Sequence, residues 1–273
     1  MRAAQGYIDG QWCGAASGAT VTVRNPADGS ALAEVPDMGA EETGRAIGAS
    51  VAAFPAWAAR PAQERGAILR RFFDALVANA EGLGVLLSLE CGKPLEEAKG
   101  EVLYAADFFS FYAEEIRRPL GEVLTPARPD RLMLTAAQPV GPCALLTPWN
   151  FPAAMPARKI APALAAGCTM VFRPAIETPL TAMAMVQLGE VAGIPKGVLN
   201  LVTGRDHAAT AGVLTRSAAI RKLSFTGSVR VGKLLMEACA PSLKRLSLEL
   251  GGHAPFIVLE DAGAQAGPRG GRW

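Results

Sequence analysis

The second half of the chain repeats one pattern, a short apolar run that ends at a turn residue and is followed by a helical stretch. Runs of this kind predict strands that are buried on both faces. Strands that alternate with helices predict an α/β fold, with a parallel sheet and helices packed on its faces. The five runs are CALLTP, CTMVFRP, VLNLVTG, IRKLSFTG and KRLSLELGG, and helical stretches follow the first four.

Parallel strands bring their carboxyl ends to one edge of the sheet, where such sheets bind ligands. Glycine and polar residues follow all five runs, so five clusters are expected to converge on that edge. The clusters are residues 147–150, 173–177, 203–206, 225–228 and 249–252.

Three other regions have patterns of their own. Apolar residues at spacings of three and four predict a helical layer from about residue 37 to 117, with Pro61 in the first turn of a helix. Short extended pieces between prolines predict a protruding β-hairpin at 119–138. PFIVLED reads as one more strand, and the Gly/Pro/Arg-rich residues beyond about Ala262 have no structural period.

Composition excludes several classes of function. The formal charge of +2 gives no field for a nucleic acid or a membrane surface. No apolar run approaches the roughly 18 residues that span a bilayer, and the N-terminus lacks the apolar core of a signal peptide. We therefore expect a cytoplasmic protein with neither nucleic-acid nor membrane partners. The five cysteines are scattered, never in CxxC spacing, and with two histidines they predict no disulfide framework and no metal site.

The run FTGSVRVG passes from a strand into a helix. Free backbone N–H groups and the positive end of the helix dipole make such a turn a seat for phosphate. The alternative is a plain strand-to-helix turn in which Ser228 caps the helix. No GxGxxG occurs, so an ordinary dinucleotide fingerprint is not present.

Two polar side chains are candidates for chemistry. Asn150 stands between two prolines in LLTPWNFP, so its amide could stabilise an oxyanion or cap the next helix. Glu249 precedes two glycines and is a candidate general base with a pKa raised by desolvation. The alternative is an ion pair with Lys244 or Arg245, although strand alternation puts Lys244 on the opposite face.

Together these stretches resemble the aldehyde dehydrogenase superfamily, from residue 6 to about 262. LLTPWNFPAAMPARKIAPALAAGCTMVFRPAIETPLTA, AGIPKGVLNLVTG, RKLSFTGSVRVGKLL and KRLSLELGGHAPFIV are similar to that family in order and spacing. MPARKIAPALAAGCT is most similar to the succinate-semialdehyde dehydrogenase branch. The resemblance implies a Rossmann-like NAD(P)-binding domain at 1–118 and 140–251, an oligomerisation hairpin at 119–139, and the start of a mostly missing catalytic domain at 252–273.

The resemblance also implies roles for single residues. Asn150 stabilises the oxyanion, Glu249 activates water, and Arg158 holds the distal carboxylate of the substrate. Gly227 and Ser228 match contacts to the cofactor diphosphate, and Leu250 lines the nicotinamide pocket. The full set that matches cofactor contacts is Thr147, Trp149, Asn150, Arg173, Ala175, Ile176, Phe225, Thr226, Gly227, Ser228 and Leu250.

The chain departs from the family at three places. The nucleophilic cysteine of the family lies about 34 residues beyond the glutamate, past Trp273, and none of the five cysteines matches its motif. The final residues GAQAGPRGGRW look like a frame-shifted reading. Ile176 stands where the family often has a hydrogen-bond acceptor for the adenine ribose. The choice between NAD and NADP is therefore open, with Arg173 favouring NADP.

We therefore expect an aldehyde dehydrogenase of the succinate-semialdehyde type that oxidises an aldehyde to an acid with NAD or NADP. This chain is expected to be inactive alone, and the full-length family to form homo-oligomers. The alternatives are a non-catalytic nucleotide-binding or subunit-interaction fragment, and a poorly folded chain without a role.

Overall fold

The computed structural model describes residues 4–118 and 121–261, which are organised around a seven-stranded sheet of order β11-β10-β7-β8-β9-β1-β2. Its five parallel strands are the five runs that the sequence predicts, so the α/β fold is confirmed. They are β7 (Cys143–Leu146), β8 (Met170–Arg173), β9 (Leu199–Leu201), β10 (Lys222–Gly227) and β11 (Arg245–Leu250).

The sequence pattern did not reveal the four N-terminal strands. β1 (Gly6–Ile8) and β2 (Gln11–Cys13) extend the sheet as antiparallel strands, with Tyr7 paired to Leu201 of β9. β3 (Thr20–Arg24) and β4 (Ala31–Pro36) form a separate antiparallel pair. Strands of three residues are too short to show an alternating pattern, so tertiary pairing defines β1 and β2.

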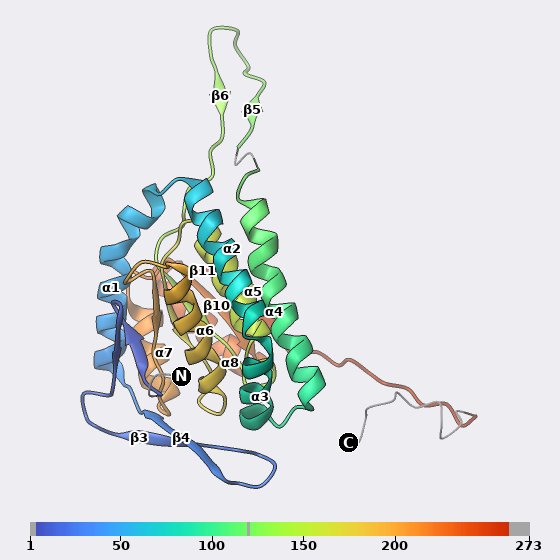
Figure 1. Ribbon diagram of the computed structural model, residues 1–273. Coiled ribbons are helices and arrows are strands. Elements are labelled where there is room, and N and C mark those ends of the chain that lie inside the picture. The colour runs from blue at the N-terminus through green and yellow to red at the C-terminus, as the bar shows by residue number, and fades with distance from the viewer. Residues whose placement is uncertain (1–3, 119–120, 262–273) are drawn as a thin grey trace.

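The helices form a layer on each face of the sheet (Figure 1). Alternation along β7 separates two apolar clusters, because Cys143 and Leu145 join the larger one while Ala144 and Leu146 join the smaller one. The larger cluster packs under α2 (Ala62–Ala78), α3 (Ala80–Cys91), α4 (Leu95–Glu115), α5 (Ala154–Ala165) and α6 (Pro179–Ala192). The smaller cluster takes residues from α1 (Ala40–Ala59), α7 (His207–Arg216) and α8 (Val229–Cys239), which the short helix η1 (Ala240–Ser242) follows.

The helical layer predicted for residues 37–117 is confirmed, with one shift of a boundary. Pro61 lies directly before α2 as its N-cap, not inside the first turn. In the described residues no single helix is long and apolar enough to cross a bilayer, although α2 and α3 together, bent by 71° at their junction, pass on length and composition.

The hairpin is confirmed as a structure. β5 (Val123–Leu124) and β6 (Met133–Leu134) pair antiparallel and project from the body of the molecule (Figure 1). Val123, Leu132 and Leu134 are exposed on it. Its role in oligomerisation remains a prediction, and the predicted segment 119–139 includes residues 119–120, which lie outside the described residues.

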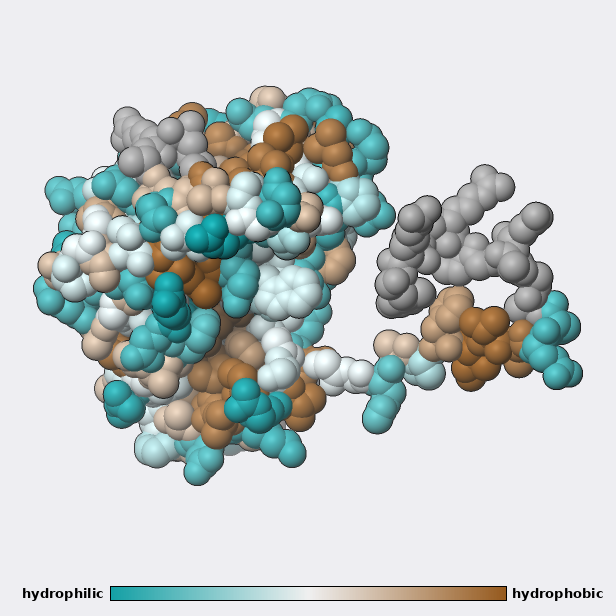
Figure 2. Space-filling view, turned by 90° about the horizontal axis from the view of Figure 1, so that it is seen from below, coloured by the Kyte–Doolittle hydropathy of each residue, from teal (hydrophilic) through white to brown (hydrophobic). Residues whose placement is uncertain are grey.

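The strand predicted at PFIVLED is wrong. Between β11 and residue 261, where the described part of the chain ends, no strand forms, and Phe256, Ile257, Val258 and Leu259 are exposed on a segment that runs away from the body (Figures 1 and 2). A strand needs a neighbour for its backbone N–H and C=O groups, and the described residues supply none here. The tail from 262 onward lies outside the described residues.

The order of the strands creates a switch point between β7 and β10. From β7 the chain proceeds through α5 to β8 and through α6 to β9, then returns through α7 to β10 on the other side of β7. Crossovers that diverge in this way open a crevice at the carboxyl ends of the two central strands. The fold therefore directs attention to the residues that follow β7 and β10.

Candidate functional site

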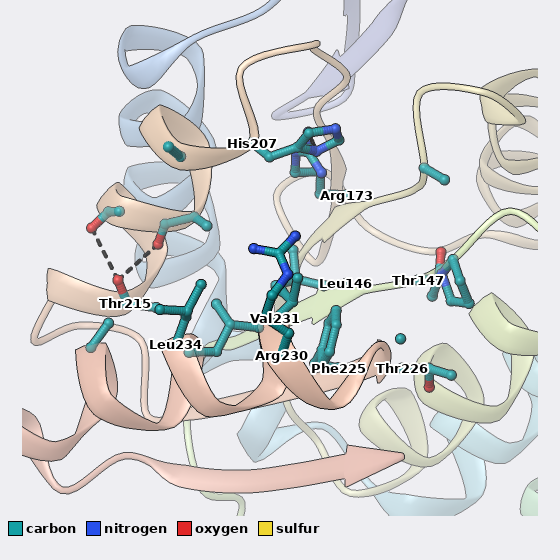
Figure 3. A pocket seen from close by; sticks show the side chains of 18 of the residues that line it. Leu146, Thr147, Arg173, His207, Thr215, Phe225, Thr226, Arg230, Val231 and Leu234 are labelled. Atoms are coloured by element: carbon teal, nitrogen blue, oxygen red, sulfur yellow. Dashed lines mark hydrogen bonds between the residues drawn. The ribbon is translucent and has the colours of Figure 1, made fainter. Parts of the chain in front are cut away.

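A cavity of about 880 Å³ lies at this switch point, between the ends of β7 and β10 and the helices α7 and α8. Its size is within the range of cofactor and ligand pockets. Leu146 and Phe225 form part of its apolar wall, and Figure 3 shows Val231 and Leu234 of α8 facing the same space. The flat apolar surfaces suit a ring system.

The charged residues that line the cavity are all cationic or can become so. Arg173, Arg216 and Arg230 line it together with His207, and none of the described lining residues is Asp or Glu. In Figure 3, Arg230 extends from α8 on the side that faces Arg173 and His207. The cavity therefore has the charge of an anion site.

Arg173 is held at the end of β8 with its guanidinium buried. Its Nη2 donates to the carbonyl of Gly204 at 2.7 Å and to Nδ1 of His207 at 2.5 Å. A guanidinium has no acceptor, so Nδ1 must be unprotonated, and burial and the charge of Arg173 both lower the pKa of His207. The Nε of Arg173 is buried without a hydrogen-bond partner among the described residues, a donor that a bound anion could satisfy.

Gly204 is required by a close approach of two backbones. A Cβ at this position would lie 2.2 Å from the carbonyl oxygen of Met38. Only glycine fits there, and the tight turn presents the Gly204 carbonyl to Arg173.

Glu249 forms an ion pair with Arg158, for which the sequence analysis predicted a different role, holding the distal carboxylate of the substrate. Arg158 Nη1 donates to Glu249 Oε1 at 2.6 Å, and the hydroxyl of Thr226 donates to Oε2 at 3.0 Å. Desolvation raises the pKa of Glu249, but the hydrogen bonds and the positive charges of Arg158 and Lys159 outweigh it and lower the pKa overall. The expected raised pKa is therefore wrong, and so is the alternative pairing with Lys244 or Arg245. β11 lies at the sheet edge, so the carboxylate is half exposed.

Lys159 is a buried lysine that the sequence analysis missed. It follows Arg158 on α5 and donates to Ser224 Oγ at 2.9 Å, and no carboxylate of the described residues forms an ion pair with it. Burial lowers its pKa to about 8, against the attraction of Glu249. In the sequence, a lysine within an amphipathic helix is expected to lie on the surface. Only the tertiary packing shows that Lys159 is buried.

Asn150 is exposed on the loop after β7, and no described residue hydrogen-bonds to its side-chain amide. The capping alternative is wrong, because the N-cap of α5 is Ala153 and the first amides of the helix bind Glu101. The side chain is thus free to donate to a ligand. Its role at an oxyanion remains a prediction.

None of the five thiols hydrogen-bonds to Glu249 or to the side-chain amide of Asn150 in the described residues. Cys91 comes nearest to the Asn150 loop, with its sulfur 3.6 Å from the Trp149 carbonyl, but burial raises its pKa and no hydrogen bond joins it to Glu249. The neighbouring thiol of Cys168 and burial raise the pKa of Cys143, whose sulfur donates to the carbonyl of Gly141 at 3.4 Å. The thiol of Cys143 lowers the pKa of Cys168, which is only 3% exposed and out of reach of an aldehyde.

The predicted cofactor residues separate into two groups. The residues that line the cavity are Thr147, Arg173, Ala175, Phe225, Thr226 and Gly227. The others lie outside its wall: Trp149 and Asn150 on the following loop, Ile176 packed against the larger apolar cluster, Ser228, and Leu250. Ser228 caps α8, accepting from Val231 N at 3.3 Å, so the capping alternative is observed and the diphosphate contact remains a prediction.

Several lining residues had no signal in the sequence. His207, Arg216, Arg230 and Leu234 lie on helices rather than at strand ends, and their direction depends on how α7 and α8 dock. His207 directly follows one of the predicted strand-end clusters, 203–206, which was the one available hint.

The chain is similar to known proteins along most of its length. The profile of the aldehyde dehydrogenase family matches residues 12–267. Glutarate-semialdehyde dehydrogenase of Pseudomonas putida is 52% identical over 258 residues, 94% of this chain and 54% of that protein. A succinate-semialdehyde dehydrogenase of Escherichia coli, named for NADP(+), is 50% identical, over 94% of this chain and 53% of its own length.

A crystal structure of succinate-semialdehyde dehydrogenase from Burkholderia pseudomallei superposes with a TM-score of 0.91 at 53% identity, over 94% of this chain and 53% of that one. The chain thus spans about half the length of the relatives it matches. It belongs to the aldehyde dehydrogenase family.

Proposed function

We propose that this chain is the cofactor-binding part of an NAD(P)+-dependent semialdehyde dehydrogenase. The observation that carries the proposal is the cavity at the switch point, which three arginines and a histidine line and to which the described residues contribute no carboxylate. NAD+ carries a diphosphate and NADP+ a third phosphate, so the charges are complementary. When bound, the cofactor would accept hydride from the substrate.

Different residues of the cavity would contact different parts of this ligand. Arg173 and Arg230 would bind phosphate, Arg173 through its unsatisfied Nε. Leu146, Phe225 and Leu234 would pack against a ring. We also propose the domain boundaries: residues 1–118 and 140–251 form the cofactor-binding domain, and residues 252–273 begin a second domain.

The substrate that fits is an aldehyde with a distal carboxylate, such as succinate semialdehyde. Glutarate and succinate semialdehydes, for which two relatives are named, share that group. Such a carboxylate would replace Glu249 as the partner of Arg158. Glu249 would then be free to take a proton from water, while the free amide of Asn150 would donate to the developing oxyanion.

By this proposal the chain alone does not oxidise aldehydes. A thiolate must form the covalent intermediate in this chemistry, and none of the five cysteines combines access with a position beside Asn150 and Glu249.

Fluorescence titration with NADPH and NADH tests the proposal. The wild-type chain should bind, and Arg230→Glu should weaken binding at least about tenfold, the effect of losing about 1.4 kcal/mol. Lys233→Glu is the matched control, since it makes the same charge change on α8 at a residue that does not line the cavity. Absence of binding by the wild type, or equal loss in both variants, would contradict the proposal.

The hairpin supports a second function, association with other subunits. Val123, Leu132 and Leu134 expose apolar surface on a projection whose two strands pair only with each other among the described residues. Homo-oligomers, or docking on intact relatives, would cover it. Sedimentation velocity of the intact chain and of a variant with these residues changed to serine tests this: the wild type should be larger.

A further inference from the structure

Lys93, between α3 and α4, contacts the loop that carries Asn150. Its ammonium donates to the carbonyl of Asn150 at 3.2 Å and lies 3.8 Å from the ring centroid of Phe151. It also forms an ion pair with Glu101, in which the Glu101 side chain is 2% exposed and that of Lys93 13%. One cation thus joins a buried carboxylate of α4 to the backbone of the loop.

The second oxygen of Glu101 binds the start of α5. Oε1 accepts from the backbone N–H groups of Ala153 at 2.9 Å and Ala154 at 3.1 Å. The first amides of a helix lack partners within the helix, and α5 has no side-chain cap of its own. Glu101 therefore takes the place of a cap from a different helix, and fixes the point where α5 begins.

The same face of α4 also supports Arg158. Tyr104 is three residues after Glu101, and its hydroxyl is 3.1 Å from Arg158 Nη2. Phe108, one turn further, lies under the guanidinium at 5.5 Å from its ring centroid. Arg158 itself is one turn into the helix whose first amides Glu101 binds, so one stripe of α4 contacts both the Asn150 loop and Arg158.

Net stability alone is a weak reason for such a pair. Burying two charges costs desolvation free energy that their attraction offsets only in part, and buried pairs of this kind are best attested as devices that fix one geometry. Here the geometry concerns side chains on which the proposed function depends.

We propose that the Lys93–Glu101 pair is a positioning device that sets the backbone of residues 149–154, and through it the Asn150 amide and the Arg158 guanidinium, for cofactor and substrate. The inference has two halves. The backbone half, that the pair sets the backbone of residues 149–154, rests on the contacts alone. The functional half, that this prepares the site for cofactor and substrate, rests on the function proposed above, so an experiment can contradict one half without the other.

Hydrogen exchange measured by mass spectrometry tests the backbone half. Lys93→Met and Glu101→Gln should speed exchange in peptides covering 149–156 by about tenfold or more, and leave those covering β7 and β8 unchanged. Lys99→Met is the matched control, because Lys99 also forms ion pairs, with Glu81 and Glu96, and neither pair includes a residue of the loop. Lys93→Arg keeps a cation and should restore slow exchange.

NADPH affinity of the same variants tests the functional half. Lys93→Met should weaken binding several-fold, because the loop begins at Thr147 and Pro148, which line the cavity. Lys93→Arg should recover most of the loss, and Lys99→Met should bind as the wild type does. Should Lys93→Met fail to fold, Lys93→Gln is measured in its place.

Exchange that is unchanged at 149–156, or that rises equally throughout the chain, overturns the inference in favour of a purely structural ion pair. A wild-type chain that does not bind NADPH overturns the proposed function and leaves the exchange result to decide the backbone claim.

Discussion

Glu249 and Arg158 bind each other, and this contact changes what each can do. A carboxylate that accepts two hydrogen bonds beside two cations is a weaker base than a desolvated one, and the pKa of Glu249 is lowered accordingly. The pair would keep both groups inactive until an anionic substrate competes for the arginine.

Arg158→Gln should therefore raise the pKa of Glu249, because desolvation remains while the strongest opposing contact is lost. Carbon-13 NMR titration of the Glu249 carboxyl measures it. Arg245→Gln removes a cation from the same strand without touching Glu249 and should leave that pKa in place. A Glu249 pKa that falls or stays constant in Arg158→Gln would show that Arg158 does not control it.

Glu90 makes a second prediction at this scale. It is buried and accepts from the amides of Leu180 and Thr181 at the start of α6, and burial raises its pKa to about 7. A raised pKa in the folded state means that its contribution to stability is present below the unfolded value of 4.5 and is lost as the pH rises through about 7.

The free energy of unfolding of the wild type, measured with denaturant, should be lower at pH 8 than at pH 5. Glu90 should account for on the order of a few kcal/mol of this difference. Glu90→Gln should lose that part of the decline. Glu81→Gln, at an exposed site on the same helix, should keep it. An equal decline in all three proteins would contradict the assignment.

At the scale of elements, the hairpin is separate from the core. β5 and β6 pair only with each other and their side chains are exposed. Replacing residues 122–135 by a short glycine linker should change the free energy of unfolding by less than about 1 kcal/mol, since little apolar surface on the body is uncovered. A loss of several kcal/mol would show that the hairpin packs on the body in solution.

The parallel strands were predictable because a strand buried on both faces must be apolar throughout, as CALL and MVFR are. PFIV has the same composition but stays unpaired, because composition cannot say whether a neighbouring strand exists. The strand-end residues of the site, such as Thr147 and Phe225, followed from sheet topology. Arg230 and Lys159 did not, because helix docking decides where their side chains point.

For the whole molecule, the switch point between β7 and β10 joins the separate observations. The cationic cavity opens on one side of it, Thr226 belongs to the cavity wall and hydrogen-bonds to Glu249, and the Asn150 loop leaves the end of β7. The cationic cavity and the candidate chemistry are therefore contiguous. The account predicts a chain that binds a dinucleotide and does not turn over an aldehyde.

A crystal structure of the chain grown with NADP+ tests this most directly. The account predicts cofactor density in the cavity between α7 and α8, with a phosphate oxygen about 3 Å from the guanidinium of Arg173 or Arg230. Density at another surface, with the cavity holding only solvent at a saturating concentration of NADP+, would contradict it.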